Sequence, residues 1–171
     1  MPVDAVVRSV WFFCTLALAS AADLRRHLIP NTFCILTAVA GLIAISPARF
    51  VGQILGPLAA LPFLGVAMIF PDRAGGGDIK FVASVGFVLG LLPTLWGGIL
   101  GLSLAIVYAA ARACIEKHCA ATPTPIGQIA IPLAPFLSIG FAIFYVLESC
   151  KQKSIAEMKK VPQNLRDQKR A

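Results

Sequence analysis

The chain has 171 residues, of which 58% are hydrophobic and only 13% are charged. Soluble domains are about 45–50% apolar and about 25% charged, so this composition excludes an ordinary soluble protein and predicts an integral membrane protein with room for about six spans. The net charge of +7 does not indicate nucleic acid binding, because the chain has no basic stripe with interleaved aromatic residues.

Six apolar runs predict an all-α, polytopic membrane protein with about six transmembrane helices. They lie at residues 6–22, 32–45, 50–70, 81–92, 94–111 and 126–147. Residues 112–125 are expected to form a polar loop, and Pro132 and Pro135 are expected to interrupt the last span. Residues 1–150 therefore form one membrane domain, and the basic tail at 151–171 is expected to be disordered or to lie on the membrane surface.

Small residues and prolines indicate how the spans pack. Gly97 and Gly101 in the fifth run have the four-residue spacing that is typical of close helix packing in membranes. The third run is expected to be kinked and to make close contacts. The residues that predict this are Gly52, Gly56, Pro57, Pro62 and Gly65.

The first apolar run has two interpretations. It ends in the small residues 18–22, which resemble a signal-peptide cleavage site. However, the N-terminal residues 1–8 carry Asp4 and only one arginine, and the basic pair Arg25-Arg26 follows the run. That charge order is typical of a retained helix with its N-terminus outside. We therefore expect a retained first span, with cleavage as the alternative.

Two carboxylates stand at the ends of predicted spans. Asp23 closes the first run, and Pro30 shortly after it prevents easy continuation of the helix. Asn31 can cap the helix that follows. Asp78 follows three glycines, and a helix that starts there places Asp78 in its first turn. A glycine-rich turn with an aspartate cap explains the second site equally well when it is taken alone.

The charges between the runs predict the membrane face of these carboxylates. Six cations lie in the loops after the first, third and fifth runs, and two lie at the N-terminus and in the remaining loops. An excess of Lys and Arg marks the cytoplasmic side, so Asp23 and Asp78 are expected there. Seven cations in 151–170 oppose this assignment. The tail is therefore an exception, or one span is miscounted.

An aspartic peptidase needs two carboxyl groups at one place. Two carboxyls held about 3 Å apart share one proton, so the ionised member can take a proton from water while the protonated member polarises a peptide carbonyl. No metal is expected. Cys114, His118 and Cys119 are bunched in one loop without a second ligand cluster, and no cofactor is indicated.

Three segments, in order, resemble the type IV prepilin peptidases, which are polytopic aspartic peptidases with a Gly-x-Gly-Asp motif. Gly75-Gly76-Gly77-Asp78 with Ile79-Lys80-Phe81 fits that motif. Asp23, Arg25 and Ile29-Pro30-Asn31 are similar to the first motif of the family, and residues 131–137, with Pro132 and Pro135, are similar to its last-span segment.

The resemblance implies that Asp23 and Asp78 are the catalytic pair. It implies cleavage of a short basic leader from a pilin precursor, usually just after a glycine, at the cytoplasmic face of the bacterial inner membrane. It also implies a substrate with a glutamate near the start of its apolar helix, and Arg25, Arg26 or Lys80 could meet that glutamate. Gly75, Gly76 and Gly77 would let an extended substrate backbone lie close to Asp78.

The resemblance also indicates a subtype and partners. The longer family members carry a cysteine-rich insert and methylate the new N-terminus. This chain has no such insert between its first two runs and resembles the short members that serve Flp/Tad-type pili. The expected partners are the precursor, the lipid bilayer and the pilus or secretion assembly machinery, with no nucleic acid. The oligomeric state is left open.

Three alternatives make different predictions. A presenilin-type intramembrane peptidase shares Gly-x-Gly-Asp but pairs it with a Tyr-Asp motif, which occurs nowhere in this sequence. A proton-coupled transporter or channel would place its carboxylates in the middle of spans. A structural subunit of a secretion assembly would tolerate the replacement of both aspartates by asparagine.

Overall fold

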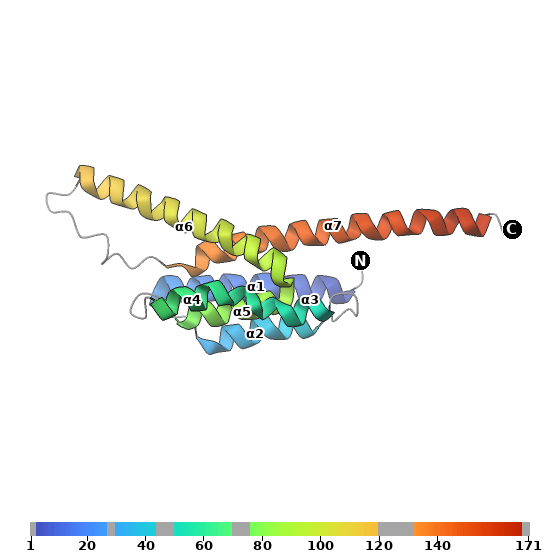
Figure 1. The fold of residues 1–171 in the computed structure, drawn as a ribbon, viewed down its shortest axis with the longest axis horizontal. Helices are drawn as coiled ribbons and strands as arrows, with labels where there is room; N and C mark the ends of the chain where they lie inside the picture. The colour runs from blue at the N-terminus through green and yellow to red at the C-terminus, as the bar shows by residue number, and fades with distance from the viewer. Residues whose placement is uncertain (1–2, 27–29, 44–49, 70–75, 120–131, 169–171) are drawn as a thin grey trace.

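The computed structural model describes residues 3–26, 30–43, 50–69, 76–119 and 132–168. These residues form helices and no strand (Figure 1). The elements in chain order are α1 (Val3–Arg26), α2 (Asn31–Leu42), α3 (Phe50–Leu55), the 3₁₀ helix η1 (Gly56–Ala60), α4 (Leu61–Ile69), α5 (Gly76–Leu89), α6 (Leu91–Cys119) and α7 (Ala134–Gln168). Because α3, η1 and α4 follow one another without a break, the order is that of the six apolar runs.

Four helical segments are long and apolar enough to cross a membrane. They are Val6–Arg25 of α1, Phe50–Ile69 of α3 to α4, Leu91–Ile115 of α6 and Ala134–Ile155 of α7. Helix α2 has 12 residues and α5 has 14. They are therefore about 18 and 21 Å long, at about 1.5 Å per residue, against a hydrocarbon core of about 30 Å. The all-helical fold is confirmed, and the number of six spans stays a prediction.

Two expected boundaries are wrong. Residues 112–119 continue α6 as helix instead of forming a polar loop, because half of them are good helix formers and charged side chains do not end a helix. Helix α7 begins at Ala134, so Pro132 precedes it and Pro135 lies in its first turn. A proline there lacks only an N–H that has no intrahelical partner, so Pro135 does not interrupt α7. Residues 126–131 of the expected last span lie outside the described residues.

The basic tail is helical as far as it is described. Helix α7 continues without a break from the apolar segment to Gln168, and Figure 1 shows its second half extending well beyond the other helices. This corrects the expectation of disorder for 151–168, since a helix that is already formed propagates more easily than it nucleates. How the tail meets the membrane, and whether 1–150 is a separate unit, stay predictions.

Helices α1 to α5 lie side by side, and α6 crosses them obliquely (Figure 1). Helix α5 packs mainly on α2 and η1, α1 packs on α7 and α2, and α6 packs mainly on α7. Figure 1 shows that the end of α1 and the starts of α2, α5 and α7 all lie at one end of the bundle. Residues far apart in the chain are thereby gathered at that end.

The core lies between α1, α5 and α7. Its largest fully buried side chains include Phe12, Phe81, Phe141 and Leu137. Many apolar side chains point outward instead, such as Met68, Val51 and Leu92. In a bilayer this arrangement carries no penalty, because lipid tails are as apolar as leucine and helices associate through close van der Waals packing and hydrogen bonds.

Glycines permit two close helix crossings. Gly56 of η1 and Gly86 of α5 approach so closely that a Cβ on either one would collide with the backbone of the other. At the second crossing, a Cβ on Gly101 of α6 would lie 2.8 Å from the Cα of Leu137 on α7, and one on Gly97 would lie 3.2 Å from the carbonyl oxygen of Gly140. The packing predicted from the spacing of Gly97 and Gly101 is therefore confirmed.

The third apolar run is irregular at its centre. Pro57 lies at the start of η1, where α-helical geometry gives way to a 3₁₀ turn, and Pro62 lies in the first turn of α4. No described atom lies within 4 Å of the position that a Cβ would take at Gly65, so the close contact expected there is wrong. Gly52 makes its close contact through its backbone, because its carbonyl oxygen lies 3.4 Å from the position that a Cβ would take at Gly90.

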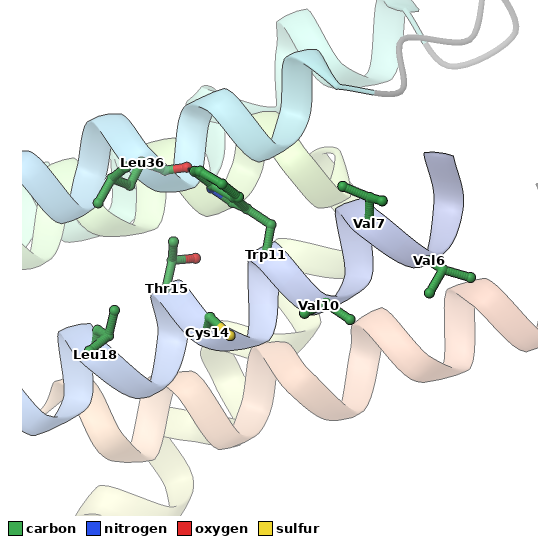
Figure 2. Close-up of a pocket in the computed structure, with 8 residues that line it drawn as sticks. All are labelled: Val6, Val7, Val10, Trp11, Cys14, Thr15, Leu18 and Leu36. Carbon is green, nitrogen blue, oxygen red and sulfur yellow. The ribbon is translucent and has the colours of Figure 1, made fainter. Parts of the chain in front are cut away.

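An apolar groove of about 470 Å³ runs along α1 on the side of α2 (Figure 2). Trp11 reaches across to α2, and its indole N–H donates to the carbonyl oxygen of Leu36 at 2.9 Å. The groove is lined by Val6, Val7, Val10, Trp11, Cys14, Thr15, Leu18 and Leu36. None of these residues carries a charge, so the groove is separate from the carboxylates described below.

Candidate active site

Asp23 and Asp78 lie at the same end of the helix bundle. Asp23 is in the last turn of α1, and Asp78 is in the first turn of α5. Both helix ends lie beside the start of α7 (Figure 1). The two carboxylates that the sequence places at span ends are thus brought to one location, which we call the acid end of the bundle.

Asp23 is buried and bonded to the start of α7. Its side chain is 7% exposed, and its Oδ2 atom accepts a hydrogen bond of 2.9 Å from the backbone N–H of Ala134, the first residue of α7. The first N–H groups of a helix lack intrahelical partners, and the helix dipole favours an anion at that position. The start of α7 therefore holds the Asp23 carboxylate in place.

Asp78 is partly buried and senses Asp23. Burial, and secondly the negative charge of Asp23, raise the pKa of the Asp78 carboxyl from 3.8 to about 6. Asp78 lies outside the four candidate spans. The Asp78 carboxyl therefore keeps its proton to a higher pH than an ordinary aspartate does.

Two serines connect α1 and α7 close to Asp23. The hydroxyl of Ser20 lies 2.8 Å from the hydroxyl of Ser138. Both hydroxyls also lie within hydrogen-bond distance of the carbonyl oxygen of Leu16. Ser20 is one turn from Asp23, and Ser138 is one turn from Ala134, so this contact lies directly behind the bond between Asp23 and α7. The sequence analysis did not identify either serine.

Helix α2 completes the acid end. Lys80, two residues after Asp78, is exposed, and its Nζ atom donates to Oδ1 of Asn31 at 3.2 Å. The expected capping role of Asn31 is wrong. Pro30 occupies the N-cap position without a side-chain hydrogen bond, and its carbonyl oxygen accepts the N–H of Phe33. The buried Cys34 lies near enough to Lys80 and Asp78 to interact electrostatically with both.

The other predicted residues are placed as follows. Gly76 begins α5 and is exposed, and Gly77 lies between it and Asp78. Arg25 is exposed, two residues after Asp23 on α1. Pro132 and Pro135 are half-buried around the start of α7. Gly75, Ile29 and the side chain of Arg26 lie outside the described residues.

No group of three metal-binding side chains occurs among the residues that the structure describes. Cys114 is exposed on α6, and the side chains of His118 and Cys119 fall outside the described part. The acid end offers two carboxylates and backbone donors, which suit proton transfer to and from water.

Sequence reasoning missed Ala134, Ser20 and Ser138 at this site. Ala134 acts through its backbone N–H, which any residue except proline carries, so its side chain gives no signal. The serines carry a weak signal, because Ser20 precedes Asp23 by three residues and therefore shares its helix face. The signal becomes interpretable only when α1 and α7 are known to be neighbours.

Comparisons with known proteins agree with the geometry. Residues 10–114 match the type IV leader peptidase family. The chain is 30% identical, over 143 residues, to the prepilin leader peptidase/N-methyltransferase of Bacillus subtilis (strain 168), a match that covers 81% of this chain and 54% of the relative. The chain thus spans about half the length of that relative. No solved structure is significantly similar. The chain belongs to the type IV leader peptidase family.

Proposed function

We propose that this protein is a membrane aspartic endopeptidase that removes the leader peptide from a prepilin-type precursor. The observation that carries the proposal is the electrostatic coupling of Asp78 to Asp23 at one end of the bundle, in a chain of the leader peptidase family. The relative's name supplies the substrate class, and the two coupled carboxylates supply the chemistry.

The two aspartates have different surroundings, and these suggest different roles. Asp23 accepts a backbone N–H at the start of α7, an environment that favours its ionised form. Asp78 has a raised pKa because it is partly buried beside that charge. We therefore assign Asp23 as the ionised member and Asp78 as the protonated member of the pair when substrate binds.

Water is the nucleophile in this mechanism. Asp23 takes a proton from the water while the water oxygen attacks the carbonyl carbon of the scissile peptide. Asp78 gives its own proton to the carbonyl oxygen. The resulting diol then collapses. The C–N bond breaks, the leaving nitrogen receives the proton held by Asp23, and Asp78 regains a proton from the diol. No covalent intermediate forms, and both carboxyls return to their starting states.

The arrangement supports this proposal over a proton path. A transporter would hold its carboxylates in the middle of spans, whereas Asp23 lies in the last turn of α1 and Asp78 in the first turn of α5. Residues 27–30 alone connect α1 and α2, where the longer members carry an insert. We therefore propose leader cleavage without methyl transfer, in the manner of the short Flp/Tad-type members, at the cytoplasmic face of the inner membrane.

Co-expression with a candidate prepilin precursor tests the proposal. The natural chain is expected to shorten the precursor, and Asp23→Asn and Asp78→Asn are each expected to abolish shortening while the protein still accumulates in the membrane. Glu148→Gln is the matched control, because it removes a carboxylate about 21 Å along α7 from Ala134, and it is expected to leave cleavage intact. Retained cleavage in either aspartate variant would overturn the mechanism.

A further inference from the structure

A buried arginine lies at the end of the bundle opposite the two aspartates. Arg8 of α1 is only 6% exposed, although it lies within a candidate membrane span. Among its contacts, Nη2 donates to the carbonyl oxygen of Val88, in the last turn of α5. A buried guanidinium in a membrane helix is costly, so its presence calls for a specific role.

The contact satisfies the end of α5. The last carbonyls of a helix have no intrahelical partner, and a carbonyl left unpaired in a membrane costs several kcal/mol. The helix dipole also favours a cation at that end. Immediately after Val88 the chain turns at Gly90, whose φ is 90°, and enters α6. Arg8 therefore holds the end of α5 at the point where the chain reverses.

The same two helices carry the two aspartates. The start of α1 contacts the end of α5 through Arg8, and the end of α1 lies beside the start of α5, where Asp23 acts on Asp78. Helices α1 and α5 therefore run antiparallel, with the Arg8–Val88 hydrogen bond near one end and the two aspartates near the other. A hydrogen bond at one end limits how far the two helices can slide along each other, and so limits the axial position of the groups at the other end.

The distances along the two helices agree with this arrangement. Arg8 precedes Asp23 by 15 residues, or about 22 Å, whereas Asp78 precedes Val88 by 10 residues, or about 15 Å. Side chains lean toward the N-terminus of their own helix. In this antiparallel pair the Asp23 and Asp78 side chains therefore lean toward each other and reduce the difference of about 7 Å.

We propose that Arg8 is a positioning residue that fixes the axial register of α1 against α5 and so brings the Asp23 and Asp78 carboxyls together. It acts through the helices and touches neither substrate nor carboxylate. The effect on activity rests on the proposed function, whereas the effect on register can be measured without any substrate.

Spin labels measure the register directly. With the five natural cysteines replaced, labels are placed through Leu24→Cys, which is exposed at the end of α1, and Gly76→Cys, which is exposed at the start of α5. Arg8→Met removes the cation and the donor, and it is expected to shift or broaden the distance between the labels. Arg8→Lys keeps both and is expected to preserve that distance. Electron paramagnetic resonance in lipid nanodiscs is the measurement.

Kinetics on the unlabelled variants, with a precursor that the natural chain cleaves, give the second readout. Arg8→Met is expected to lower kcat by about 10- to 100-fold, since misplacement by about 1 Å can cost this much, while KM changes by no more than about twofold. Arg8→Lys is expected to restore kcat to within about threefold of the natural chain. Ser9→Ala is the matched control, because the Ser9 hydroxyl lies within hydrogen-bond distance of the Tyr145 hydroxyl of α7.

The outcomes separate the two proposals. An unchanged label distance in Arg8→Met, or a loss of kcat in Arg8→Lys at an unchanged distance, overturns the positioning role. If Arg8→Met does not accumulate, Arg8→Gln, which keeps one N–H donor on a shorter side chain, must move the labels. If the natural chain cleaves no precursor, the proposed function fails, and the label distances still decide the register.

Discussion

The helices of this protein meet in two different ways. At the crossings of Gly56 with Gly86 and of Gly97 and Gly101 with Gly140, backbones touch and leave no room for a Cβ. At the acid end, one hydrogen bond holds Asp23 at the start of α7, and the negative charge of Asp23 disfavours ionisation of Asp78. Close packing of backbones thus fixes how the helices cross. At the acid end, the charge of the side chains decides their behaviour more than their size does.

The difference predicts opposite sensitivities. A glycine crossing should reject any added atom and should ignore charge, because its partners are backbone atoms. The acid end should tolerate a change of size where its surface is open and should fail when a carboxyl is replaced by an amide. Four substitutions, from the largest effect to the smallest, test this contrast.

The largest effect is expected when either carboxyl is replaced by an amide. Asp23→Asn and Asp78→Asn should each lower kcat by at least about 10³-fold, and the double variant should fall little further, because two groups that act as one unit give non-additive effects. The measurement is kcat of the purified protein on a precursor. Losses that multiply in the double variant would show that the two carboxyls act independently.

A glycine crossing should respond in stability and not in chemistry. Gly101→Val adds atoms where a Cβ alone already lies 2.8 Å from the Leu137 backbone, and it should lower the free energy of unfolding by about 1–3 kcal/mol. Gly65→Val is the matched control, because no described atom lies within 4 Å of a Cβ there, and it should change stability by less than about 0.5 kcal/mol. Unfolding in mixed detergent measures both.

Equal destabilisation by the two valines would contradict the contrast between packed and open glycines. It would mean that valine acts through a general effect on membrane helices. A loss of kcat per folded molecule in Gly101→Val would show that a shift at Leu137 reaches Ala134, one turn away on α7, and through it Asp23.

The sequence predicts the packing and the motif residues well, for a physical reason. Apolar runs locate helices because each span must be long and apolar, and the spacing of Gly97 and Gly101 predicts a close face because it follows the helix period. Asp78 is expected in a first turn because glycines precede it, and α5 does begin at Gly76. These features depend on residues that are neighbours in the chain.

The remainder of the candidate site depends on neighbours that the chain does not make adjacent. The backbone N–H of Ala134 reaches Asp23 only because α7 begins beside the end of α1, and no side chain announces this contact. Arg8 in the sequence is only a cation near the start of the first run. Its contact with Val88 requires the antiparallel arrangement of α1 and α5. Asn31 is expected from the sequence to cap α2, but its side-chain oxygen accepts a hydrogen bond from Lys80 instead.

The raised pKa of Asp78 predicts how stability depends on pH. Its pKa is about 6 in the folded protein against an ordinary value of 3.8, so the folded state binds the proton more tightly than the unfolded state. The contribution of Asp78 to the free energy of unfolding is therefore fully present below about pH 4 and is lost as the pH rises through about 6. Asp78→Asn, which never ionises, should be more stable than the natural chain above that pH, by on the order of 2 kcal/mol.

Unfolding at several pH values measures this difference, which should vanish near pH 4. Asp23→Asn gives the control. It removes the second cause of the shift and leaves burial, the larger cause, so the pH dependence should move to lower pH without disappearing. A difference between Asp78→Asn and the natural chain that stays constant from pH 4 to pH 8 would contradict the assignment of the charge penalty to Asp78.

The smallest effect is expected at Gly76, where the acid end is open. No described atom lies within 4 Å of a Cβ at this position, and alanine is favoured over glycine in a helix by about 0.5–1 kcal/mol, so Gly76→Ala should leave the protein equally or slightly more stable. If an extended substrate backbone lies close to the glycines before Asp78, the added methyl should raise KM by a few-fold and leave kcat nearly unchanged.

Gly52→Ala is the matched control for this last prediction. Its Cβ also meets no described atom within 4 Å, but it lies in α3 near the end of α5 at Gly90, and it should alter neither KM nor kcat. Steady-state kinetics on the two alanine variants compare them directly. A raised KM in both would attribute the effect to helix stiffening, whereas a raised KM in Gly76→Ala alone would identify the glycine segment as a surface that the substrate contacts.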